Sequence, residues 1–97
     1  MAAYLIANLK VHDAAGFARY GAAVAPMVAR FGGRYLVRGG ALEDVEGSFG
    51  LERLVILEFA DMAALHAFYF SDDYKPLLAL REAAAESQVT LVEGLAP

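Results

Sequence analysis

The sequence contains no cysteine, which excludes disulfide bonds and thiolate chemistry and leaves the redox compartment undetermined. Basic residues are also few, since 8 Lys and Arg stand against 12 Asp and Glu, for a net charge of −4. A nucleic-acid-binding surface needs a basic stripe, so we expect no nucleic-acid partner. The first ten residues lack a basic n-region, which argues against a signal peptide.

Long uninterrupted apolar runs are absent as well. The most apolar stretch, residues 54–70, contains Glu58, Asp61 and His66, so we expect no membrane span. We see no repeats, linkers or low-complexity segments, and 97 residues are too few for two hydrophobic cores. The sequence therefore predicts a single domain over residues 1–97, with a soluble cytoplasmic protein as the default.

Apolar residues, in contrast, are abundant. They make up 59% of the chain, above the roughly 45–50% that is typical of soluble domains. The mean hydropathy is +0.44. Helices can cover one face of a sheet, and the surplus apolar surface indicates a second face that is buried against a partner. We therefore expect a homodimer.

Hydrophobic periodicity predicts the order of secondary structure. The predicted strands are residues 4–11, 34–38, 53–59 and 88–93. A first helix is capped by Asp13 and ends at the glycine pair 32–33. A second follows Asp61 and, after an interruption at residues 71–73, continues to Ala84. This β-α-β-β-α-β order predicts an α+β, ferredoxin-like domain, with a four-stranded antiparallel sheet and its helices on one face.

The face without helices is the informative one. Strand alternation places Ile6 and Asn8 of the first strand on this open face, with Arg38 of the second and Ile56 and Glu58 of the third. The last strand fits either orientation. A buried charge needs a partner, so we predict an Arg38–Glu58 pair on neighbouring strands. Two packed sheets would then enclose a cavity lined by Asn8, Arg38 and Glu58.

Several segments of the chain resemble the DUF1330 family, a group of small domains of uncharacterised function. They are GGRYLVRGG at 32–40, the Glu46-Gly47 turn, LVILEF at 54–59, AFYFSDDYKPLLALR at 67–81 and LVEG at 91–94. The resemblance implies a homodimer in which two sheets form a dimeric α/β barrel with the helices outside. The wider superfamily includes cofactor-free monooxygenases, haem-binding enzymes, isomerases and dehalogenases, but the resemblance supplies no catalytic residues.

Two interpretations stay open for the charged candidates. Arg38 could bind a ligand carboxylate in a bidentate manner or serve as a structural partner of Glu58. Glu58 could be a general base with a raised pKa or an ionised ion-pair partner. His66 could be a proton shuttle or haem ligand at a cavity mouth, or a solvated helix residue.

A second group of candidates surrounds the break in the second helix. Tyr69, Tyr74 and Arg81 could form a lid over a pocket, or pack in the core and hydrogen-bond nearby groups. The two histidines have no neighbouring ligand cluster and no phosphate loop is present, so we predict no metal site and no cofactor. The leading hypothesis is a protein that binds a small, partly apolar anion between the sheets. The alternatives are a non-catalytic structural or regulatory dimer, and a cofactor-independent oxygenase-like or isomerase-like enzyme.

Overall fold

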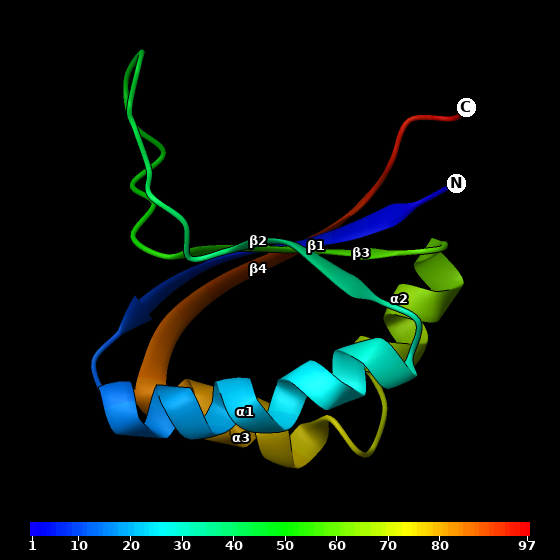
Figure 1. The fold of residues 1–97 in the computed structure, drawn as a ribbon, viewed down its shortest axis with the longest axis horizontal. Helices are drawn as coiled ribbons and strands as arrows, with labels where there is room; N and C mark the ends of the chain where they lie inside the picture. The colour runs from blue at the N-terminus through cyan, green and yellow to red at the C-terminus, as the bar shows by residue number, and fades with distance from the viewer.

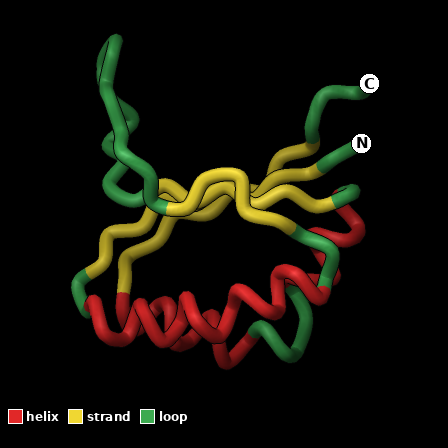
Figure 2. The backbone as a smooth tube through the Cα atoms, in the orientation of Figure 1, coloured by secondary structure: helices red, strands yellow, loops and turns green.

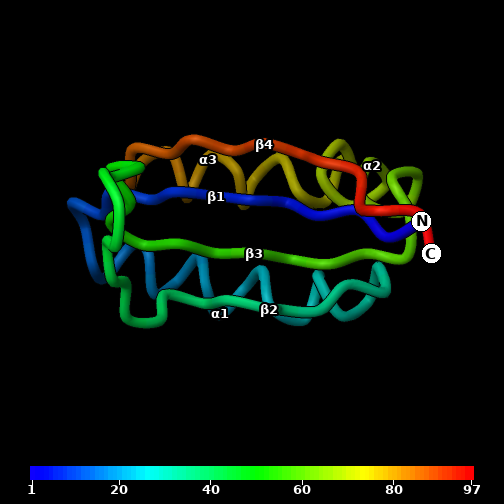
Figure 3. Tube along the Cα trace, turned by 90° about the horizontal axis from the view of Figure 1, so that it is seen from above, coloured from blue at the N-terminus to red at the C-terminus, as the bar shows by residue number.

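The computed structural model describes residues 1–97 as one antiparallel sheet with three helices. The elements are β1 (Ala3–Val11), α1 (Ala14–Arg30), β2 (Arg34–Arg38), β3 (Leu54–Phe59), α2 (Met62–Tyr69), α3 (Lys75–Ala84) and β4 (Ala85–Glu93). The strand order is β2-β3-β1-β4 (Figure 3). Helices α1 and α3 lie side by side under one face of the sheet, and α2 lies at one end (Figure 1). The predicted ferredoxin-like α+β fold is confirmed.

The predicted helix caps are in place. The Asp13 carboxylate accepts a hydrogen bond from the backbone N–H of Gly16 at 3.1 Å, and the Asp61 carboxylate accepts one from that of Ala64 at 2.8 Å. Both bonds satisfy N–H groups that have no partner within the helix. Between α2 and α3, the Ser71 hydroxyl donates to a carbonyl of α2 and accepts from the backbone N–H of Tyr74. These contacts fix the turn between α2 and α3.

The hydrophobic core lies between the helices and the inner face of the sheet. Alternation in β1 and β3 directs one set of side chains into this core, as the sequence predicts. The core residues are Ala3, Leu5, Ala7, Leu9, Val24, Met27, Val28, Leu57, Phe59, Leu65, Phe68 and Tyr74. None of the helices is both long enough and apolar enough to cross a membrane.

Strand β4 begins at Ala85, directly after α3 and earlier than the predicted residue 88. The reason is the length of β1, whose last residues pair with the start of β4, ending with Val11 opposite Ala85. The same register places Thr90 opposite Ile6 and Val92 opposite Tyr4. Thr90 and Val92 therefore lie on the open face, which resolves the orientation that the sequence leaves undecided.

Strand β2 contains an irregularity that the sequence analysis does not anticipate. Tyr35 pairs with Leu57, but the next paired residue, Val37, is opposite Ile56, so Leu36 is an extra residue in a β-bulge. After the bulge the alternation is inverted. Arg38 lies opposite Val55, on the helix-facing side of the sheet. The predicted placement of Arg38 on the open face is therefore wrong.

The open face has no covering element within the chain. Its exposed apolar side chains include Ile6, Leu36 and Val92, which are 37%, 44% and 41% exposed. Residues 40–52, which we call the arm, extend from the end of the sheet on the side opposite the helices (Figure 2). Phe49 of the arm is 92% exposed. The amide of Asn8 holds the base of the arm through backbone groups of Gly50 and Glu52.

Candidate functional site

A cavity of about 60 Å³ lies between the inner face of the sheet and helices α1 and α3. This volume accommodates several water molecules or a small organic group. Most of its lining is aliphatic or aromatic, and its only charged side chains are Arg38, Arg53 and Arg81. The hydroxyl-bearing lining residues are Tyr20, Tyr35 and Tyr74. The cavity thus has apolar walls, and its polar side chains are arginines and tyrosines, which can donate hydrogen bonds.

Three lining residues, Tyr20, Tyr74 and Arg81, form a hydrogen-bonded chain in which Tyr20 is half-buried. Nη1 of Arg81 donates to the Tyr74 hydroxyl at 3.0 Å, and that hydroxyl lies 2.8 Å from the Tyr20 hydroxyl. Nη2 of Arg81 also donates to the Tyr69 hydroxyl at 3.4 Å. Tyr74 and Arg81 are only 1% and 5% exposed. Arg81 is therefore a buried cation whose observed partners are neutral hydroxyls.

The surroundings of Tyr74 and Arg81 determine their protonation states. Burial raises the pKa of Tyr74 far above its ordinary value, and the adjacent Tyr20 hydroxyl raises it further. Burial disfavours the charged form of Arg81, but the nearby tyrosine hydroxyls outweigh this effect and keep the pKa of Arg81 above its ordinary value. Tyr74 is consequently a neutral hydroxyl and Arg81 a cation at physiological pH.

The raised pKa of Tyr74 predicts a loss of stability at alkaline pH. Above pH 10 the unfolded chain releases the Tyr74 proton while the folded chain retains it, so folding is opposed increasingly as pH rises. The free energy of unfolding should fall by about 1.4 kcal/mol per pH unit in this range. Urea denaturation at a series of alkaline pH values measures the slope. Tyr74→Phe should remove this contribution, and an unchanged slope in that variant would contradict the assignment.

Two further arginines lie nearer the sheet. The Arg38 guanidinium lies 4.5 Å from the Tyr35 ring centroid, and the Arg53 guanidinium lies 5.2 Å from that of Phe17. Such stacking orients a guanidinium while leaving its N–H groups free. Gly39 has a φ of +69°, and a Cβ at that position would lie 2.7 Å from Nη1 of Arg53. The glycine therefore allows both the turn and the position of Arg53.

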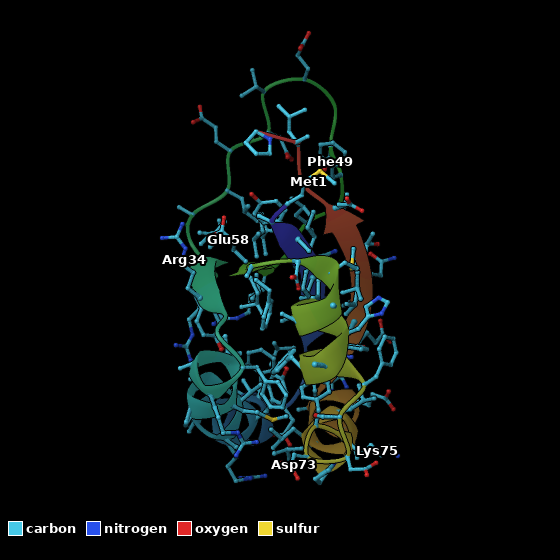
Figure 4. The ribbon with its side chains drawn as sticks, turned by 90° about the vertical axis from the view of Figure 1, so that its right-hand side faces the viewer. Met1, Arg34, Phe49, Glu58, Asp73 and Lys75 are labelled. Atoms are coloured by element: carbon cyan, nitrogen blue, oxygen red, sulfur yellow. The ribbon has the colours of Figure 1, made fainter.

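None of the three cavity arginines forms an ion pair. The ion pairs of the chain are Arg34–Glu58, Arg30–Asp73 and Lys75–Asp72. Figure 4 shows Arg34 and Glu58 at the edge of the sheet, with Asp73 and Lys75 at the helical end. In addition, Nε of Arg53 and Nε of Arg81 are buried without a hydrogen-bond partner in the protein. The cavity therefore holds positive charge that no carboxylate of this chain neutralises.

The structure divides the predicted site residues into two groups. Arg38, Tyr74 and Arg81 line the cavity, and Tyr69 contacts Arg81. The others lie elsewhere. Glu58 and Asn8 are on the open face, and exposed His66 of α2 packs edge-on against Phe70. Because the sheet separates Arg38 from both Asn8 and Glu58, these three cannot line one cavity. The predicted Arg38–Glu58 pair is also wrong, because Glu58 accepts from Nε of Arg34 at 2.6 Å.

Sequence reasoning missed two residues of the cavity, Arg53 and Tyr20, although signals for both are present. Arg53 is in phase with Val55 and Leu57, the helix-facing set of β3. Tyr20 belongs to the inward apolar stripe of α1, where a hydroxyl needs a buried partner. No group of three or more acidic, histidine or cysteine side chains that could hold a metal ion comes together. The chemistry available in the cavity is donation of hydrogen bonds by cations and hydroxyls.

The model of the "Domain of unknown function (DUF1330)" family matches residues 2–95 of the sequence. The chain belongs to the DUF1330 family. For this DUF1330 protein, a search of curated proteins finds no significant match.

Solved structures resemble this DUF1330 protein over nearly its whole length. A protein of unknown function from Rhodopseudomonas palustris has a TM-score of 0.78 at 19% identity, covering 99% of this chain and 84% of its own. A dimeric ferredoxin-like protein of unknown function from Jannaschia sp. has a TM-score of 0.68 at 18% identity, covering 97% and 100%. SnoaB, a cofactor-independent oxygenase from Streptomyces nogalater, has a TM-score of 0.64 at 16% identity, covering 99% and 95%. At these identities the likeness establishes the fold.

Proposed function

We propose that this DUF1330 protein binds a small, partly apolar organic anion in the cavity between the helices and the sheet. The observation that carries the proposal is the convergence of Arg38, Arg53 and Arg81 on one apolar cavity without a carboxylate partner. Nε of Arg53 is buried without a partner, and a buried charge is costly unless it is paired. A ligand carboxylate would supply the missing partner, and its apolar part would contact the aliphatic and aromatic walls.

The exposure of the three arginines indicates which of them can contact a ligand. Arg38 is exposed and Arg53 half-buried, so both can meet a ligand as it enters. Their guanidinium planes are suited to bidentate binding of a carboxylate. Arg81 is buried and engaged with tyrosine hydroxyls, so it contributes positive potential deeper in the cavity. We therefore assign carboxylate binding to Arg38 and Arg53.

Propionate and its neutral isostere propionamide test this assignment by isothermal titration calorimetry. Propionate should bind at least about tenfold more tightly, because hydrogen bonds to a charged group are stronger. Arg38→Gln and Arg53→Gln should each weaken propionate binding about 10- to 100-fold, since each removes a charge-assisted hydrogen bond. Their effect on propionamide should be much smaller.

Arg19→Gln is the matched control, because it removes the same charge from an exposed position of α1 that does not line the cavity. This variant should bind propionate like the wild type. Equal affinity for propionate and propionamide, or an effect of Arg19→Gln as large as that of Arg53→Gln, would contradict a built anion site.

We further propose that the protein forms a homodimer through the open face of the sheet. The exposed apolar side chains of that face and the exposed Phe49 of the arm support this proposal, because contiguous apolar surface favours association. The arm extends on the same side as the open face and would contact a second copy packed there (Figure 1). The Jannaschia protein of similar fold is described as dimeric.

The alternatives suggested by the sequence receive less support. A purely structural dimer does not account for three unpaired arginines around a cavity inside each subunit. An oxygenase activity, as in SnoaB, draws on a likeness at 16% identity alone. We therefore propose ligand binding and assign no reaction.

A further inference from the structure

We propose that the Tyr20 hydroxyl is a fixed hydrogen-bond donor to the ligand, so that the site selects small carboxylates that carry an oxo group. This inference rests on the proposed anion site and adds a second point of recognition to it. It follows from the direction of the hydrogen bonds in the chain formed by Arg81, Tyr74 and Tyr20.

The direction of this chain is set by Arg81. A guanidinium can only donate, so the Tyr74 oxygen accepts from Nη1 of Arg81. The Tyr74 hydroxyl has one proton of its own, and its residue is 1% exposed. The one other polar group in hydrogen-bond contact with this hydroxyl is that of Tyr20, at 2.8 Å. If Tyr20 donated instead, the Tyr74 proton would be buried without an acceptor, which is unfavourable.

Tyr74 therefore donates to Tyr20, and the proton of Tyr20 is left for another acceptor. No acceptor for it is present in the protein, and Tyr20 lines the cavity. Donation from Arg81 through Tyr74 polarises each successive hydroxyl and makes the terminal O–H a stronger donor. A ligand oxygen next to the Tyr20 hydroxyl would complete the chain.

The polar groups of the cavity define the ligand class. Arg38 and Arg53 offer a place for a carboxylate, and Tyr20 offers a donor to a second, neutral acceptor oxygen. Aliphatic and aromatic side chains such as Val24 and Leu57 make up the rest of the lining. A short carboxylate with a carbonyl oxygen matches this pattern. The simplest members of the class carry the oxo group next to the carboxylate or one carbon away.

Pairs of ligands that differ in one atom group test the inference. Pyruvate and methacrylate have nearly the same shape, but the carbonyl oxygen of the first is a methylene group in the second. Acetoacetate and its methylidene counterpart form a second pair. By calorimetry, the wild type should prefer the oxo member of at least one pair by about tenfold. Tyr20→Phe should abolish this preference while the methylidene member binds as before.

Two further variants distinguish a role in ligand recognition from a general effect on the structure. Tyr4→Phe is the matched control, because it removes the same hydroxyl from a tyrosine on the open face of β1, outside the lining of the cavity. It should retain the preference. Tyr74→Phe keeps the Tyr20 hydroxyl but removes the group that orients it, and should reduce the preference.

The outcomes distinguish this inference from the anion site on which it rests. If propionate binds but both members of each pair bind equally, the role of Tyr20 is overturned and the anion site stands. Retention of the preference in Tyr20→Phe would likewise overturn the role of Tyr20 and leave the anion site standing. If no carboxylate binds the wild type, both proposals fail. A full preference in Tyr74→Phe would overturn the orientation of Tyr20 by Arg81.

Discussion

Replacing Ile6 by aspartate is expected to convert the proposed dimer into folded monomers. Ile6 lies on the open face of the central strand β1, opposite Ile56 and Thr90, and is 37% exposed in the single chain. The monomer therefore tolerates a carboxylate there. In a two-fold dimer the substitution places two charges in the interface. Each unpaired buried charge costs about 3–5 kcal/mol, so the dissociation constant should rise more than about a thousandfold.

Size-exclusion chromatography with light scattering measures this change, and circular dichroism confirms that the variant is folded. Ala22→Asp is the control, because it introduces the same charge at an exposed position on α1, on the helical side of the molecule. That variant should remain dimeric. A dimeric Ile6→Asp protein, or a wild type that is monomeric at micromolar concentration, would show that the open face is not the interface.

Phe68→Ala should cause the largest loss of stability of any single truncation that we consider. Phe68 is 1% exposed and packs against Phe31, Phe59 and Tyr74 with ring centroids 5.0–6.0 Å apart. Its removal leaves a void among rings that other elements hold in place. The free energy of unfolding should fall by about 3–5 kcal/mol.

Phe70→Ala provides the comparison, because it is the same substitution two residues later in the chain at a side chain that is 65% exposed. It should cost less than about 1 kcal/mol. Urea denaturation at one fixed protein concentration gives both values, since dimerisation would make stability depend on concentration. Equal losses in the two variants would mean that the core is not centred on Phe68.

The fold was accessible from the sequence because its determinants are local and mutually consistent. Asp13 and Asp61 lie at helix starts, and alternation in β1 and β3 separates a core-facing set from an open-face set. The order of elements then leaves few topologies. Strand β4 was placed less well, because its orientation and its start depend on pairing with β1, which is a tertiary contact.

The candidate site was only partly accessible, for two physical reasons. The bulge at Leu36 has no distinct local signature in this sequence, and it inverts the alternation on which the position of Arg38 was based. The Arg81–Tyr74–Tyr20 chain joins residues 54 positions apart, which no spacing rule relates. Arg53, in contrast, could have been found by extending the alternation of β3 one step toward the N-terminus.

The bulge in β2 also bears on how related sequences should be aligned. If the same residues paired without the bulge, Val37 would lie opposite Val55 and Arg38 opposite Leu54, so the two side chains would exchange faces of the sheet. A homologue shorter by one residue here would pair without a bulge and still place its aligned arginine opposite Val55, on the helix-facing side. A one-residue gap at this point is thus compatible with an arginine on the same face, whereas a homologue of equal length without the bulge would present that charge to the open face.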